Sequence, residues 1–201
     1  SLRDLVLGRL GKTDVIVASS TFFREQLADD IRADEAFAQR LSAIAPLVVA
    51  QAFVTGQESG RTAGDVRIYG VDDRFWRFHG VTGISGPSDR DVFLSPALAD
   101  RIAAKESDAV LVRTQRPTDV PLETLHGRRE NLGRTMRLTV RRVLPASSLG
   151  EFSLEARQGE VLAAFVPLSR MQQDLEIDGR VNAMLVSAKE GASGSRGAIE
   201  S

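Results

Sequence analysis

The clearest pattern in the sequence is an alternation of apolar and polar side chains over residues 135–141. Met136, Leu138 and Val140 alternate there with arginine and threonine residues. Successive side chains of a β-strand point to opposite faces of its sheet, so a period of two predicts a strand with one buried and one solvent-facing side. The fold must therefore contain a sheet with a polar outer face, and other segments must cover its apolar face.

Other apolar segments predict further strands. The run 47–54 is almost entirely apolar, which predicts a central strand buried on both faces. Shorter strands are expected at 14–19, 66–69, 109–112, 162–166 and 181–186.

Helices are expected where apolar residues recur every three or four positions. This spacing predicts one helix within 23–31 and a second within 37–44, which Pro46 would end. A helical turn is expected at 75–78. The pair Ser95-Pro96 is typical of a helix start, with Ser as the N-cap and Pro at the first helical position.

The order of these elements indicates the fold class. Helices and strands alternate near the start of the chain, whereas the middle is rich in strands and long loops. This order favours an α+β fold over a regular parallel sheet. The polar segment 115–133 predicts a long excursion, and the Gly/Ser-rich segment 189–201 predicts a flexible linker.

Composition and charge exclude several classes of site. The chain has no cysteine, so it has no disulfide, thiolate metal site or cysteine nucleophile. Its 26 basic and 27 acidic residues give a net charge of -1, which offers no overall attraction for nucleic acid. The longest apolar run, 43–54, contains Pro46 and Gln51 and is shorter than the roughly 20 residues that span a bilayer. The chain opens at Ser1 without a methionine, which suggests a fragment of a longer protein.

Three patterns could carry chemistry, and each is incomplete. The first is the segment 8–13, which ends like a phosphate-binding P-loop. That motif needs a glycine where this chain has Val6, and it needs a helix after it, whereas Thr13 leads into a predicted strand.

The second pattern is a serine hydrolase site, and the third is a metal site. Ser85 is one residue out of register for a nucleophile elbow, and the two histidines, His79 and His126, are the available bases. Asp72, Asp73 and His79 are too few and too poorly spaced to predict a metal site. Asp72 is better interpreted as a turn or helix-cap residue.

Arginines are concentrated between residues 128 and 142. They are Arg128, Arg129, Arg134, Arg137, Arg141 and Arg142. Arg137 and Arg141 share the polar face of the predicted strand, and Arg134 lies near its start. One interpretation is a solvated face with salt bridges to nearby acidic residues. The other is a contact surface for a partner or for acidic lipid headgroups, with Arg134, Arg137 and Arg141 as the candidate partner-contact residues.

Several short segments follow one another in a distinctive order. They are Arg9-Leu10-Gly11, Phe22-Phe23-Arg24, Ile68-Tyr69-Gly70-Val71-Asp72 with Phe75-Trp76, Phe93-Leu94-Ser95 with Ala97-Leu98-Ala99, Leu138-Thr139-Val140 with Val143-Leu144-Pro145, and Phe165-Val166-Pro167-Leu168. Together they resemble the MacB-like periplasmic core domains of FtsX-type ABC-transporter permeases. The chain departs from that family at Glu106-Ser107-Asp108, where many relatives have a Gly-Asp turn, and in the length of 115–133.

The resemblance implies one extracytoplasmic domain over residues 1–188, inserted between the first and second transmembrane helices of a permease. A mixed α/β lobe would comprise about 13–71 and 160–188. A mostly β lobe, about 72–159, would be inserted into it. Residues 189–201 would lead to the following membrane helix.

The resemblance also implies a function that needs neither a cofactor nor an active site. The domain would couple cytoplasmic ATP hydrolysis to lipoprotein release, efflux or related mechanical work at the periplasmic face of the bacterial inner membrane. Its partners would be an ABC ATPase subunit, a second permease copy and an extracytoplasmic partner protein or lipoprotein, with the membrane reached through flanking helices. No nucleic acid is expected. A free-standing ligand-binding or adhesion domain and an unrecognised hydrolase stay open as alternatives.

Overall fold

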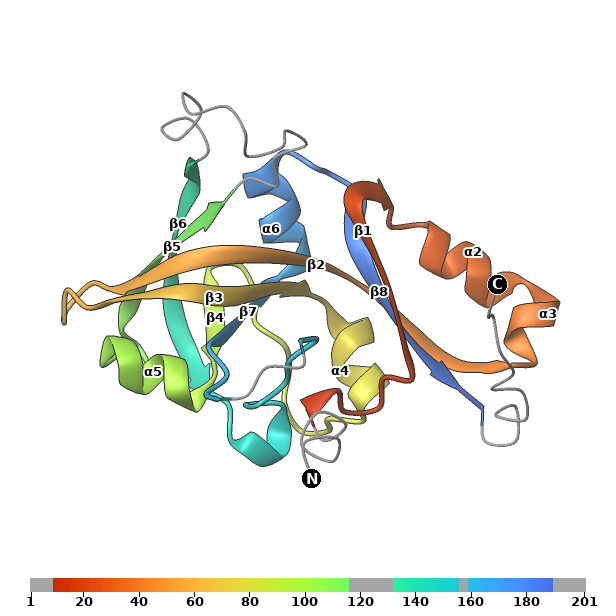
Figure 1. Ribbon diagram of the computed structural model, residues 1–201, viewed down its shortest axis with the longest axis horizontal. Coiled ribbons are helices and arrows are strands. Elements are labelled where there is room, and N and C mark those ends of the chain that lie inside the picture. The colour runs from red at the N-terminus through yellow and green to blue at the C-terminus, as the bar shows by residue number, and fades with distance from the viewer. Residues whose placement is uncertain (1–8, 116–131, 156–158, 190–201) are drawn as a thin grey trace.

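The computed structural model describes residues 9–115, 132–155 and 159–189 (Figure 1). The described strands are β1 (Val15–Arg24), β2 (Leu41–Gly56), β3 (Thr62–Val71), β4 (Asp91–Leu94), β5 (Ala109–Gln115), β6 (Leu132–Val143), β7 (Ala163–Pro167) and β8 (Arg180–Ala188). The described helices are α2 (Leu27–Ala33), α3 (Glu35–Ala38), α4 (Asp73–His79), α5 (Pro96–Ile102) and α6 (Leu168–Leu175), with a 3-10 turn at Ala146–Ser148. The α+β class is confirmed.

Six of the strands close into a small barrel. Their order is β2-β3-β7-β4-β6-β5, and β5 pairs again with β2 through Phe53 and Arg113. Most neighbours are antiparallel, but β3 runs parallel to β7 and β4 runs parallel to β6. The barrel is therefore a mixed sheet, and its closure leaves β2, β3, β4, β5, β6 and β7 with neighbours on both sides.

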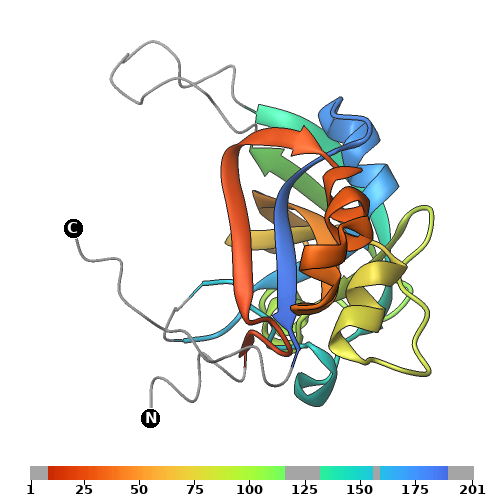
Figure 2. The same cartoon turned by 90° about the vertical axis from the view of Figure 1, so that its right-hand side faces the viewer.

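The first half of β2 continues out of the barrel into a three-stranded antiparallel extension. There β2 pairs with β8 over Leu41–Leu47, and β8 pairs with β1. Figure 2 shows β1 and β8 side by side, with α2 and α3 packed beside them. Where β8 turns away from β2, the side-chain amide of Asn182 accepts from the N–H of Val49 and donates to its carbonyl, both at 2.8 Å. A side chain thus satisfies the backbone groups that a strand would otherwise have paired.

Two apolar cores lie on opposite faces of the barrel wall. The barrel interior is filled by inward-facing aliphatic residues of all six strands, and α5 and α6 add Ile102 and Met171 to it. The second core is aromatic, and Phe75 of α4 packs there against Phe152 and Phe165. The parallel pair β3 and β7 is consequently buried on both faces.

Several predicted elements are confirmed. The alternation over 135–141 lies in β6, with Met136, Leu138 and Val140 buried. The predicted helix start is α5, whose Leu98 N–H is accepted by the Ser95 hydroxyl at 3.3 Å. Asp72 is the N-cap of α4, as expected.

The helix predicted within 37–44 is wrong. The described α3 ends at Ala38, and β2 begins at Leu41. Pro46 lies inside this strand, at a point where β2 pairs with β8 but has not yet met β3, whose pairing begins at Val48. Proline lacks a backbone N–H, so it is tolerated in a strand where one side has no neighbour.

Two further expectations need correction, and one helix was missed. The run 47–54 is a strand, but it is not buried on both faces along its length, since Phe53 on the outer face is 41% exposed. Phe23 belongs to β1 rather than to the helix predicted within 23–31, which begins at Leu27. Helix α6 had no sequence-based prediction.

The proposed division into two lobes stays a prediction. In the structure, β4 of the segment 72–159 pairs with β7 of the segment 160–188, so one sheet runs through both. None of the helices in the described ranges is long and apolar enough to cross a membrane.

Candidate functional site

The three arginines proposed as partner contacts occupy two places. Arg137 and Arg141 are exposed on the outer face of β6. Arg134 lies at the start of the same strand and donates to the carboxylate of Glu176, which follows α6. Their role in partner binding stays a prediction. Arg128 and Arg129 lie outside the described residues.

A charged cluster surrounds Arg74 at the carboxyl ends of the parallel strands β3 and β7. The Arg74 guanidinium donates to Asp72 at 2.6–3.2 Å and to Glu25, and it lies 3.6 Å from an oxygen of Asp29. Gln172 of α6 donates to the second oxygen of Glu25 at 2.8 Å. The Arg74 guanidinium thus links α4 to the end of β1 and to α2. Gln172 connects α6 to the same cluster.

The electrostatics of this cluster favour the charged state of Arg74. Its side chain is only 16% exposed. Burial by itself lowers the pKa of Arg74, but the hydrogen bonds to Asp72 and Glu25 outweigh it and raise that pKa above the ordinary value. The cluster therefore places one charged guanidinium among the carboxylates of Glu25, Asp29 and Asp72, and its net charge is negative.

A cleft of about 710 Å³ opens beside the cluster. Its charged lining residues are Glu25, Asp29, Asp72, Asp73, Arg74, Arg77 and Asp89. Carboxylates outnumber guanidinium groups there, and the best-buried guanidinium is already bonded to carboxylates. The arrangement is suited to joining structural elements, because the donors of Arg74 are directed at its own chain.

His79 lies in an aromatic environment, which is unlike the surroundings of a catalytic base. It is 8% exposed, and the rings of Phe75, Phe78 and Phe152 lie 4.7–5.1 Å from its own, centre to centre. Its Nδ1 accepts from the backbone N–H of Lys12 at 3.4 Å. Burial, and next the charge of Lys12, lower the pKa of His79 to about 4.

The hydrolase and metal patterns are not assembled around His79 within the described ranges. Its Nε2 has no hydrogen-bond partner there, and Ser85 lies on an exposed loop. Asp72, one of the two carboxylates considered with it, is held by Arg74. The described part of the chain contains no group of three or more His, Asp or Glu residues that could hold a metal ion. His126 lies outside it.

The segment that was compared with a P-loop packs against α4. Gly11 has a φ of +59°, and a Cβ at this position would lie 2.5 Å from Nδ1 of His79. Thr13 is buried and leads into β1, as the sequence indicated. Gly8 lies outside the described residues. The glycine at 11 therefore serves a close approach to the histidine ring.

Comparisons with known proteins identify solved structures that have a similar fold. No protein-family model and no curated protein matches the chain. One of these solved structures is the crystal structure of the periplasmic region of MacB from Actinobacillus actinomycetemcomitans. The match covers 94% of this chain and 80% of the MacB chain, with a TM-score of 0.54 and 11% sequence identity. The chain has the fold of this transporter domain. The extracellular domain of the noncanonic ABC-type transporter YknZ from Gram-positive bacteria matches 85% of this chain and 75% of its own, with a TM-score of 0.53 at 11% identity.

The resemblance seen in the sequence is thus confirmed at the level of the fold. The segment Ile68-Tyr69-Gly70-Val71-Asp72 supplies the end of β3 and the N-cap of α4. The Arg74 cluster was missed by sequence reasoning. The local signal for it was the pair Asp72 and Arg74, since Glu25 and Gln172 lie far away in the chain.

Proposed function

We propose that this chain is the extracytoplasmic domain of an ABC-transporter permease. The observation that carries the proposal is the match of 94% of the chain to the periplasmic region of MacB. A chain that shares only part of a fold would leave large segments unmatched. Since the identity is 11%, the likeness supports the class of protein rather than a particular substrate.

The path of the chain supports the same proposal. The described chain enters the fold through β1 and leaves it through β8, and these strands are antiparallel neighbours. The N–H of Ala188 donates to the Asp14 carboxylate at 2.8 Å, so entry and exit lie side by side. This arrangement suits a domain held between two consecutive membrane helices.

Under this proposal the domain couples ATP hydrolysis by a cytoplasmic ABC ATPase to the handling of a substrate or partner outside the membrane. It lies at the periplasmic or extracytoplasmic face of a bacterial inner membrane, within a permease that pairs with a second copy. An extracytoplasmic protein or a lipoprotein is the partner. The domain itself carries out no catalysis.

The location can be tested with single cysteines, because the natural chain has none. Glu58 lies in the exposed turn between β2 and β3, whereas Ala52 is fully buried in the barrel. In cells that make the parent protein, a membrane-impermeant maleimide should label Glu58→Cys from outside and leave Ala52→Cys unlabelled until the protein is denatured. Labelling of Glu58→Cys solely after cell lysis would place the domain on the wrong side of the membrane and reject the proposal.

The coupling role can be tested by removing the domain. Because β1 and β8 are neighbours, a short Gly/Ser linker can replace residues 15–188 in the parent permease. The reconstituted transporter should retain basal ATP hydrolysis and lose transport. Transport at the original rate by the deleted form would contradict coupling through this domain.

A further inference from the structure

The outer face of the barrel carries an ordered set of exposed and half-buried side chains on β2, β5 and β6. Cross-strand pairing places Phe53, Arg113 and Thr135 in one row. The next row contains Thr55, Leu111 and Arg137. Residues that are directly opposite in neighbouring strands share a face, so two apolar side chains lie within one strand spacing of two arginines.

Arg141 extends the positive charge along β6. It lies four residues after Arg137, at the irregularity where β6 pairs with β4. We call Phe53, Leu111, Arg113, Arg137 and Arg141 the arginine face. Phe53 also lies over Gly64 of β3, whose missing side chain leaves room for the ring.

The arginines of this face differ from five others that are paired with carboxylates. Arg67, Arg74, Arg101, Arg134 and Arg170 each bond to a carboxylate. In the described part of the chain, Arg113 has a weak contact with the Thr135 hydroxyl at 3.5 Å, and no carboxylate bonds to Arg113, Arg137 or Arg141.

Two acidic residues on the adjoining strands accept hydrogen bonds from neutral groups rather than from these arginines. Asp65 of β3 accepts from the amide of Gln51, and Asp91 of β4 accepts from the Ser88 hydroxyl at 3.3 Å. In the described part of the chain, the face therefore presents guanidinium donors that are not paired with a carboxylate. A flat surface of this kind attracts carboxylates, which guanidinium groups bind in a two-pronged geometry.

We propose that the arginine face binds a protein partner that presents carboxylates on both sides of an apolar side chain. The apolar side chain would pack on Phe53 and Leu111, and the carboxylates would pair with Arg113 and Arg137. Aromatic and arginine residues are enriched in protein interfaces, and they supply much of the binding energy there.

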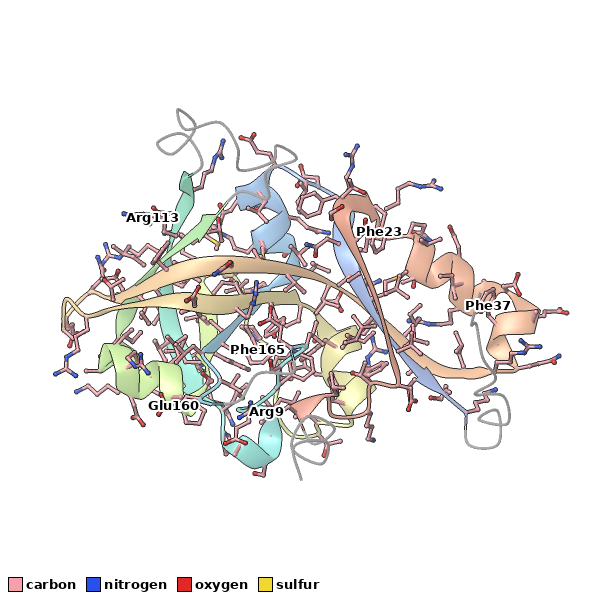
Figure 3. The ribbon with its side chains drawn as sticks, viewed as in Figure 1. Arg9, Phe23, Phe37, Arg113, Glu160 and Phe165 are labelled. Carbon is pink, nitrogen blue, oxygen red and sulfur yellow. The ribbon has the colours of Figure 1, made fainter. Side chains whose placement is uncertain are left out.

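The position of the face favours a protein over a lipid surface. In Figure 3, Arg113 lies at the upper left of the molecule, whereas Arg9, the first described residue on the entry side of the chain, lies near its lower edge. If the chain is anchored as the proposed function requires, Arg113 is directed away from the bilayer. The choice of a protein partner over a lipid surface rests on that proposed function. The charge pattern of the face is independent of it.

A selection from a library of short random peptides tests the proposal on the whole chain. Peptides selected on the natural chain should be enriched in Asp and Glu around an apolar residue. They should bind the double variant Arg113→Glu/Arg137→Glu about tenfold or more weakly, because paired charges become repulsive. The matched control is Arg32→Glu/Arg101→Glu, which makes the same change in net charge at two exposed arginines already paired with Asp29 and Glu160, and it should bind the peptides unchanged.

Two further measurements keep the outcome decisive. The variant Arg113→Gln/Arg137→Gln should also weaken binding, and melting curves show whether either double variant is folded. Selected peptides without acidic enrichment, or equal affinity for all variants, would overturn the proposal. Arginine-dependent binding to phosphatidylglycerol vesicles, in place of peptides, would assign the face to lipid. If peptides bind as expected but Glu58→Cys is not labelled from outside, the proposed function fails while the peptide-binding surface stands.

Discussion

Replacing Arg74 by alanine should destabilise the fold more than the loss of any exposed ion pair. Its guanidinium bonds to Asp72 and Glu25, which belong to separate elements. Hydrogen bonds to charged groups contribute about 1.5–3 kcal/mol each. Breaking a buried pair by removing one partner costs about 3–5 kcal/mol, because a charge is left without compensation.

Solvent screening reduces these values at this site. The side chains of Arg74 and Glu25 are 16% and 24% exposed, so they are only partly buried. We therefore expect Arg74→Ala to lower the free energy of unfolding by about 2–4 kcal/mol. For a chain of this length each kcal/mol lowers Tm by about 2–4 °C, which gives a fall of roughly 5–15 °C.

Urea and thermal unfolding, followed by circular dichroism, measure both quantities. The matched control is Arg101→Ala, which removes a pair with Glu160 whose side chains are 54% and 65% exposed. That change should cost less than about 1 kcal/mol. Equal losses for the two variants would refute the reasoning that the Arg74 cluster joins the elements around it. A double-mutant cycle with Glu25→Gln would isolate the contribution of that one pair.

The two remaining predictions concern His79 and Gly150. Because burial lowers the pKa of His79 from 6.5 to about 4, the unfolded chain binds the proton first as the pH falls. This group therefore leaves the free energy of unfolding unchanged above pH 6.5 and lowers it by up to roughly 3 kcal/mol as the pH falls to 4. The variant His79→Gln should not show this part of the acid destabilisation, which urea unfolding at successive pH values measures. A Cβ at Gly150 would lie 2.3 Å from the Leu144 carbonyl oxygen, so Gly150→Ala should lower the free energy of unfolding by at least about 2 kcal/mol. The control Gly60→Ala lies at an open position with a φ of +68° and should lower it by about 1 kcal/mol. Similar unfolding midpoints for the two glycine variants, or a pH profile unchanged in His79→Gln, would contradict these expectations.

Local periodicity predicted the elements whose geometry is regular. Strand β6 was evident because each of its inward residues is apolar and each outward residue between them is Arg or Thr. The error over 37–44 has a physical origin. A register irregularity between Leu41 and Ala43 breaks the period of two in β2, so Leu41 and Ile44 both contact the small core beneath α2. Three-residue spacing on one face imitates a helix.

Features that depend on pairing between distant segments could not be predicted in this way. Closure of the barrel requires β2 to pair with β5, and no local pattern in either strand specifies that register. The same holds for Arg74, whose partner Glu25 follows β1 and meets it only in the folded chain, and for Gln172 of α6, which bonds to Glu25. For Arg137 and Arg141 the sequence predicted a common face, and the structure adds Arg113 and Phe53 from neighbouring strands.

Strand β2 has a mechanical consequence of its own. Its 16 residues form one continuous strand of roughly 50 Å, with pairing irregularities at two points. One end lies beside β8, where the chain leaves the fold, and the other reaches the turn at 57–61. An extended backbone cannot lengthen, so a displacement imposed on the residues next to Leu41 must either be carried to that distant turn or break the pairs along the way.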